Sequence, residues 1–256
     1  MEKLFDVSGK VALVTGGSRG IGEMIAEGYV RNGVRVYITA RKATACDQTA
    51  ERLSEFGECI SVPADLSTGA GIETLTNTIR ERESTLDILV NNAGATWGAA
   101  FDEFPEAGWD KVMDINVKSP FFLSQALIDL LAAAATHESP SRIINIGSID
   151  GLHVSRLETY SYAASKSAIL HLTRMMAKNL VRRHITVNAV APGPFESKMM
   201  AHTLATMGDQ IVAEVPRGRI GKPSDMAGVA LYLASEAGSY LTGVVIPVDG
   251  GLSTTI

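Results

Sequence analysis

A tyrosine and a lysine stand four residues apart in the segment Tyr162-Ala163-Ala164-Ser165-Lys166. The apolar residues that follow recur at helical spacing, so both side chains are expected on one face of a helix. An ammonium beside a phenol favours the phenolate, and we therefore expect Lys166 to lower the pKa of Tyr162. Such a tyrosine can give or take a proton. A partner-facing tyrosine beside a solvated lysine has the same spacing, so the pair alone does not decide its role.

Three glycines, Gly16, Gly20 and Gly22, follow the apolar run 11–14 and precede a segment with helical periodicity, 24–32. The missing side chains let the backbone approach a phosphate, and a helix N-terminus offers free N–H groups. This order of strand, turn and helix predicts a site for a dinucleotide. Glycines that are needed only for close packing would give the same pattern.

Strand-like and helix-like segments alternate along most of the chain. Strands are expected at 11–14, 34–39, 60–62, 86–90, 142–146, 185–190 and 244–248, and helices at 24–32, 43–56, 69–83, 106–135, 160–181 and 223–234. This alternation predicts an α/β fold, a Rossmann-type doubly wound sheet of about seven parallel strands flanked by helices. We expect residues 1–256 to form a single domain.

Three details depart from this regular alternation. Pro120 lies inside the long helical segment and is expected to kink or reset it, because proline lacks an N–H donor. Residues 194–222 are expected to be loop or short helix and to form a lid over the substrate. Ser224 or Asp225 could cap the helix that follows.

The composition argues against several classes of function. The net charge is −5, and no run of Lys or Arg is long enough for a nucleic-acid or membrane surface. The sequence has no secretory signal and no apolar stretch of about 18 residues that could span a membrane. Cys46 and Cys59 form no disulfide framework and lack metal-ligand neighbours. We therefore expect no metal site and a cytoplasmic location.

The glycine spacing Gly-x-x-x-Gly-x-Gly differs from that of other dinucleotide folds. Together with Asn91-Asn92-Ala93-Gly94, Ser148 and Tyr162-x-x-x-Lys166, it resembles the short-chain dehydrogenase/reductase family. The resemblance extends from Gly9 to Gly251, and it implies an oxidoreductase that acts on CH–OH and C=O groups.

The resemblance implies a role for each of four catalytic residues. Tyr162 would give its proton to a substrate carbonyl as hydride arrives at carbon, and Lys166 would lower the tyrosine pKa and bind the nicotinamide ribose. Ser148 would hold and polarise the carbonyl. Asn116 matches the family asparagine that holds a water in a proton relay, and a hydrogen bond at a helix kink is the alternative for it.

The end of the second strand bears on the choice of cofactor. NAD-binding members carry an acid there, whereas this chain has Thr39-Ala40-Arg41. Arg41 and Arg19 could pair with a 2′-phosphate, which favours NADP(H). The cofactor-binding residues that the resemblance implies are Gly16, Ser18, Arg19, Gly20, Ile21, Gly22, Arg41, Asp65, Leu66, Asn92, Ala93, Gly94, Tyr162, Lys166, Pro192, Gly193, Phe195 and Ser197.

The substrate is expected to face the segments 94–101, 149–160 and 194–215. Their apolar residues are Trp97, Phe101, Leu152, Val154, Met199, Met200, Leu204 and Met207. Such a set suits an acyl chain or another hydrophobic ketone, and packing between subunits is the alternative for the methionines. The chain is similar to 3-oxoacyl thioester reductases of fatty acid metabolism, including the kind associated with rhamnolipid formation.

Several alternatives stay open. The substrate could be free, CoA-linked or carried by acyl carrier protein, although segment 137–141 is not basic as it often is in carrier-dependent members. An alcohol, sugar or steroid dehydrogenase of the same family is the second possibility, and a cofactor-binding module without catalysis is the third. The apolar surfaces of 106–135 and 160–181 predict a homo-oligomer, either a dimer or a tetramer.

Overall fold

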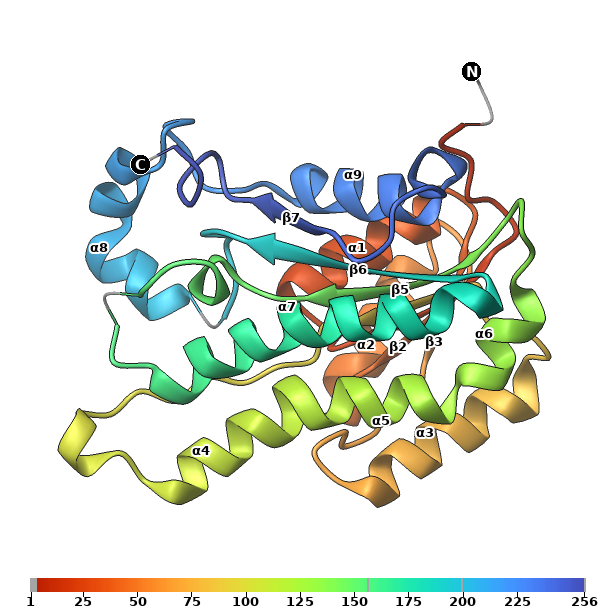
Figure 1. The fold of residues 1–256 in the computed structure, drawn as a ribbon, viewed down its shortest axis with the longest axis horizontal. Helices are drawn as coiled ribbons and strands as arrows, with labels where there is room; N and C mark the ends of the chain where they lie inside the picture. The colour runs from red at the N-terminus through yellow and green to blue at the C-terminus, as the bar shows by residue number, and fades with distance from the viewer. Residues whose placement is uncertain (1–3, 156, 199, 256) are drawn as a thin grey trace.

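A single parallel sheet organises the computed structural model, which describes residues 4–155, 157–198 and 200–255 (Figure 1). Its strand order is β3-β2-β1-β4-β5-β6-β7. The strands are β1 (Val11–Thr15), β2 (Arg35–Thr39), β3 (Cys59–Ser61), β4 (Ile88–Asn91), β5 (Ser141–Ile146), β6 (Ile185–Pro192) and β7 (Val245–Val248). The predicted fold class is confirmed. The order reverses between β1 and β4, and open α/β sheets bind ligands beyond the carboxyl ends at such a point.

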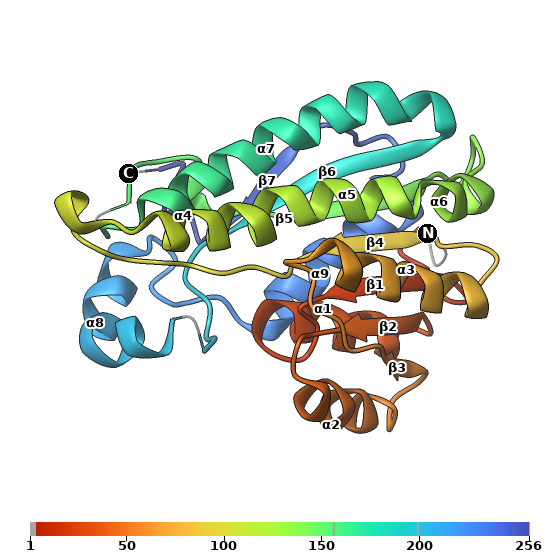
Figure 2. The same ribbon diagram turned by 90° about the horizontal axis from the view of Figure 1, so that it is seen from below.

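Helices cover both faces of the sheet (Figure 2). One core cluster contains residues of α1 (Gly20–Arg31), α2 (Ala43–Leu53) and α9 (Pro223–Ala234). The other contains residues of α3 (Gly69–Arg82), α5 (Ser119–Ala126), α6 (Ile128–Ala134) and α7 (Tyr160–Leu180). Successive residues of β1 point into opposite clusters, which explains why this strand is an uninterrupted apolar run.

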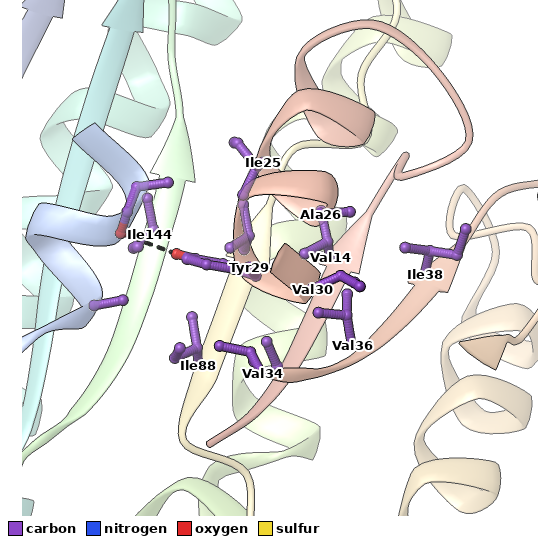
Figure 3. Packing of buried hydrophobic residues seen from close by; sticks show 14 of the residues in the cluster. Val14, Ile25, Ala26, Tyr29, Val30, Val34, Val36, Ile38, Ile88 and Ile144 are labelled. Carbon is purple, nitrogen blue, oxygen red and sulfur yellow. Dashed lines mark hydrogen bonds between the residues drawn. The ribbon is translucent and has the colours of Figure 1, made fainter. Parts of the chain in front are cut away.

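Tyr29 joins two helices on the first of these faces (Figure 3). Its ring lies fully buried among Ile25, Val34 and Ile144, and its hydroxyl donates to the carbonyl of Ala230 in α9 at 3.1 Å. This bond fixes α1 against α9 and thereby helps to hold the start of α1 beside the end of β1.

The expected helix 106–135 is not one helix kinked at Pro120. It consists of α4 (Glu106–Met113), a π-helical turn (Asp114–Lys118), α5 and α6. Pro120 lies in the first turn of α5, where a missing N–H is tolerated, and the Ser119 N–H donates to the Asp114 carbonyl five residues earlier. The sharp bend, 58°, falls instead between Glu106–Ala126 and Ile128–Ala134.

The segment 194–222 contains more regular structure than expected. Its helix, α8 (Ala201–Glu214), has 14 residues and is interrupted at Met207, whose φ is −133°. Figure 1 places α8 beyond the carboxyl ends of β6 and β7. Of the two expected caps for α9, Asp225 acts as one by accepting from the Lys222 N–H at 2.8 Å, whereas the N-cap position is Lys222 and not Ser224.

The described ranges contain neither a single membrane-spanning helix nor a cluster of metal-binding side chains. No single helix in them is long and apolar enough to cross a membrane, and one bent pair, α4–α5 with α6, reaches the required length and composition. Within the same ranges, no group of three or more His, Cys, Asp or Glu side chains could hold a metal ion.

Candidate active site

Thr15 organises the glycine turn at the switch point of the sheet. Its Oγ1 accepts from the N–H groups of Asn92 and Ala93, both at 2.9 Å. The Asn92 side chain also bonds this turn, because its Nδ2 donates to the carbonyls of Thr15 at 2.8 Å and Gly16 at 3.3 Å. The expected cofactor residue Asn92 therefore fixes the turn to the end of β4. Sequence reasoning missed Thr15, although its place between a strand and the first glycine was a usable signal.

The turn has the shape that a pyrophosphate needs. Gly16 and Gly20 have φ values of +65° and +56°, which other residues rarely adopt. A Cβ on Gly22 would lie 2.4 Å from the Gly16 carbonyl oxygen. No side chain caps the N-terminus of α1, so its first N–H groups are left for an anion. These features of the turn fit a dinucleotide.

Two arginines, Arg19 and Arg41, follow the neighbouring strands β1 and β2. Arg19 is at the N-cap of α1 and Arg41 follows β2, and the strands that precede them pair in register from Val11–Arg35 to Thr15–Thr39. Both guanidinium groups are exposed, and within the described part of the chain neither is paired with a carboxylate. They are therefore free to receive a phosphate.

Other expected cofactor residues have side chains that are already engaged. Asp65 Oδ1 accepts from the N–H and hydroxyl of Ser67, at 3.1 and 2.7 Å. The side chain of Leu66 packs in the second core cluster. Any contact of Leu66 with a cofactor is therefore left to its backbone.

The loop after β6 shows the same division between backbone and side chain. Pro192 and Phe195 are buried, and a Cβ on Gly221 would lie 2.3 Å from the Phe195 ring. Only the backbone of Phe195 can face a ligand. Ser197 accepts from the Met200 N–H at 3.3 Å and lies against Gly20, so this loop closes over the start of α1. Met199, an expected substrate contact, lies outside the described residues.

Ser148, Tyr162 and Lys166 come together beyond the end of β5. Ser148 follows that strand and hydrogen-bonds the Tyr162 side chain. Lys166 Nζ lies 5.5 Å from the centre of the Tyr162 ring and donates to the Ile146 carbonyl at 2.8 Å. Ser148 and Lys166 are buried, at 8% and 6% exposure, and Tyr162 is half-buried. The structure thus places a hydroxyl, a phenol and an ammonium side by side.

The expectation that Lys166 lowers the pKa of Tyr162 is wrong for this structure. Burial raises the pKa of Tyr162 to about 12, and the hydrogen bond with Ser148 offsets only part of that effect. Burial also lowers the pKa of Lys166 to about 8. The reason is that desolvation opposes both the Tyr162 phenolate and the Lys166 ammonium. The ammonium also donates to the Ile146 carbonyl and not to the Tyr162 hydroxyl. Tyr162 therefore keeps its proton at neutral pH, as a proton donor must.

Asn116 lies in the π-helical turn and connects three segments. Its Oδ1 accepts from the Ala95 N–H at 2.9 Å, and its Nδ2 donates to the Ala95 carbonyl at 3.0 Å and to Ser165 Oγ at 2.9 Å. Ser165 Oγ in turn donates to the Tyr162 carbonyl at 2.7 Å. The side chain thus holds the 94–101 loop against α7, and sequence reasoning missed the Ser165 link.

The other side chains near Ser148 form the rim of the site. Tyr160 does not join the catalytic group, because its ring stands edge-on to Phe101 and Phe104 and its hydroxyl bonds Glu158. His153 is exposed and contacts the Val154 carbonyl through Nδ1. The rim thus contains an aromatic cluster beside exposed polar side chains.

Known proteins resemble this chain over nearly its whole length. A family model described as enoyl-(acyl carrier protein) reductase matches residues 16–253. The rhamnolipids biosynthesis 3-oxoacyl-[acyl-carrier-protein] reductase of Pseudomonas aeruginosa is 50% identical, over 98% of this chain and 99% of that protein. A 3alpha-hydroxysteroid dehydrogenase of Mediterraneibacter gnavus is 33% identical, over 94% and 96%.

A solved structure agrees with these relatives. The Pseudomonas aeruginosa RhlG/NADP active-site complex has a TM-score of 0.95 and 49% identity, and the match covers 99% of this chain and 100% of that one. With the family model spanning most of the sequence, the glycine turn and the Ser148–Tyr162–Lys166 group have a common explanation. The chain belongs to the short-chain dehydrogenase/reductase family.

Proposed function

We propose that this protein is an NADPH-dependent reductase of a ketone, most simply a 3-oxoacyl thioester or a related hydrophobic carbonyl compound. The observation that carries the proposal is the meeting of Ser148, Tyr162 and Lys166 beside an uncapped glycine turn. The relative that is 50% identical is named for 3-oxoacyl reduction, and the RhlG complex contains NADP. Both support the reaction type and the cofactor.

The protein's own residues divide the work on the carbonyl group. Ser148 donates a hydrogen bond to the substrate oxygen, and Tyr162 transfers its phenolic proton to that oxygen as it becomes an alkoxide. Lys166, protonated below about pH 8, would bind the nicotinamide ribose of the cofactor. Asn116 fixes, through Ser165, the helix turn that carries Tyr162. Bound NADPH supplies the hydride to the carbonyl carbon.

The glycine turn and the arginines would hold that cofactor. The first N–H groups of α1, from Gly20, Ile21 and Gly22, with the backbone of Ser18, would bind the pyrophosphate. Arg19 and Arg41 would bind the 2′-phosphate. The remaining predicted contacts are Gly16, Asp65, Leu66, Asn92, Ala93, Gly94, Tyr162, Lys166, Pro192, Gly193, Phe195 and Ser197.

Arg41→Ala should weaken the preference for NADPH over NADH. The variant loses a charge-assisted bond to the 2′-phosphate, so its KM for NADPH should rise about 10- to 100-fold while its kinetics with NADH hardly change. Steady-state kinetics with both cofactors test this. The control is Arg31→Ala, which removes a guanidinium paired with Glu27 at the other end of α1. Its KM for NADPH and its KM for NADH should both equal the wild-type values. A wild-type preference for NADH would contradict the assignment.

A substrate screen tests the proposed reaction. NADPH oxidation is followed at fixed pH with 3-oxoacyl-CoA, 3-oxoacyl carrier protein, simple ketones, 3-oxosteroids and an enoyl thioester. Highest kcat/KM for a 3-oxoacyl compound supports the proposal. The steroid is the specific second candidate because of the hydroxysteroid dehydrogenase relative. Reduction of the enoyl compound alone would contradict ketone reduction.

The whole chain is proposed to act as one domain, with 194–222 as a lid that orders over the substrate. Hydrogen exchange in α8 should slow when cofactor and ketone are both present.

Free, buried cysteines support a cytoplasmic location. Exposed apolar side chains on α4, α5 and α7, namely Trp109, Phe121, Phe122 and Met175, support a homo-oligomer of two or four subunits, which sedimentation would test.

A further inference from the structure

Asp150 is a carboxylate at the edge of the candidate site, two residues after Ser148. It lies in a short 3-10 turn, Ile149–Gly151, that directly follows Ser148. Its backbone N–H donates to Ser148 Oγ at 3.1 Å. The side chain is half-buried, and within the described ranges no hydrogen-bond donor or cation lies in bonding distance of it. A carboxylate that is partly desolvated and unbonded acts on its surroundings mainly through its charge.

The turn that carries Asp150 is packed against α7 at Lys166. A Cβ on Gly151 would lie 2.7 Å from the carbonyl carbon of Lys166, and Ser167 Oγ donates to the Gly151 carbonyl at 3.2 Å. These contacts fix the Asp150 backbone beside the first turns of α7. The turn is therefore held against the part of α7 that carries Lys166, and among the described residues Asp150 forms no ion pair.

The ionisable groups around this carboxylate form a small set. Asp150 acts electrostatically on Tyr162 and Lys166, and Lys166 and His153 act on Asp150. The adjacent strand β6 has no titratable side chain. In the π-helical turn, Asp114 and Lys118 bind each other at the surface. No other carboxylate among the described residues has a comparable influence on Tyr162 and Lys166.

Arg142, the charged residue of β5, belongs to a different part of the protein. It stands at the start of that strand, and its guanidinium donates to the carbonyls of Leu233 and Ser235 at the end of α9. Ser148 and Asp150 lie beyond the opposite end of β5. Among the described residues, Asp150 is thus the carboxylate whose charge acts on Tyr162 and Lys166.

We infer that Asp150 is a positioning residue for the proton donor: its charge retains the protons on Tyr162 and Lys166 and so extends upward the pH range in which the site can reduce a ketone. The inference rests on the proposed role of Tyr162. The directions agree, because Asp150 raises the pKa of Tyr162 and also that of Lys166, against the burial that lowers the latter. Burial raises the pKa of Asp150 itself, so its influence should fade in acid.

The test compares Asp150→Asn with wild type over a range of pH. The alkaline limb of kcat/KM for ketone reduction should move down by about one to two pH units, the size expected for a charge about 6–12 Å away at an effective dielectric constant of about 20. Asp150→Glu keeps the negative charge, so its alkaline limb should stay close to the wild-type pH. The matched control is Asp102→Asn, which also removes one negative charge near the rim but acts on Tyr160 instead. Its alkaline limb should stay at the wild-type pH.

A second readout does not depend on the substrate. NMR of tyrosines isotope-labelled at Cζ, with Tyr162 assigned from the Tyr162→Phe variant, should show the Tyr162 titration moving to lower pH in Asp150→Asn. If no ketone is reduced, the proposed function fails and this titration still decides the role of Asp150. If Asp150→Asn does not fold, Asp150→Ser replaces it. A lower kcat/KM with both pH readouts unmoved, or an equal shift in Asp102→Asn, overturns the inference.

Discussion

Tyr162→Phe should lower kcat for ketone reduction by about a thousandfold and leave NADPH binding within about threefold of wild type. The substitution removes one oxygen, and the ring keeps its half-buried place near Lys166 and Ser148. Only the proton donor is lost, because the glycine turn and the arginines do not contact this hydroxyl. NADPH fluorescence measures binding, and NADPH oxidation measures turnover.

Tyr240→Phe is the matched control, since Tyr240 is fully exposed and far along the chain from the site. It should have wild-type kcat and KM. Turnover of Tyr162→Phe within threefold of wild type would refute the catalytic assignment. Loss of NADPH binding in that variant would mean that the hydroxyl holds the cofactor rather than donating a proton.

Local patterns in the sequence were sufficient to predict the sheet. Most strands are short segments rich in apolar residues because both faces of the sheet are covered, and the alternating residues of β1 enter two different core clusters. The glycine turn was equally readable, since its spacing follows from backbone conformations at Gly16 and Gly20 that need no long-range contact. The short distance from Ser148 to Tyr162 in the chain also kept them within reach of each other.

What sequence reasoning missed depends on contacts between distant segments. The π-helical turn places Asn116 where it can bond Ala95 and Ser165, and neither partner is implied by the spacing of apolar residues. The pKa of Tyr162 depends on how deeply the tyrosine is buried, and the spacing between Tyr162 and Lys166 in the sequence does not reveal that. Phe195 was expected at the cofactor, but its ring is buried against Gly221, a residue from beyond α8.

Gly22→Ala should weaken NADPH binding about a hundredfold and lower the free energy of unfolding by about 1–3 kcal/mol, through a single added methyl group. That methyl would lie 2.4 Å from both the Gly16 carbonyl oxygen and Asn92 Nδ2. Neither atom can yield easily, because the Asn92 side chain bonds the backbone of Thr15 and Gly16. The turn must therefore open, and its N–H groups lose their common direction toward a phosphate.

Gly228→Ala is a control that should raise, not lower, the free energy of unfolding. Gly228 lies inside α9, and a Cβ there would meet no atom within 4 Å. Alanine restricts the unfolded chain and suits a helix interior, so this variant should be about 0.5–1 kcal/mol more stable with unchanged NADPH affinity. Thermal unfolding with and without NADPH separates the two variants: the cofactor should raise the melting temperature of Gly228→Ala as in wild type and scarcely affect Gly22→Ala. If Gly22→Ala instead binds NADPH normally, Gly22 serves the packing of α1 against the turn and the phosphate site must lie elsewhere.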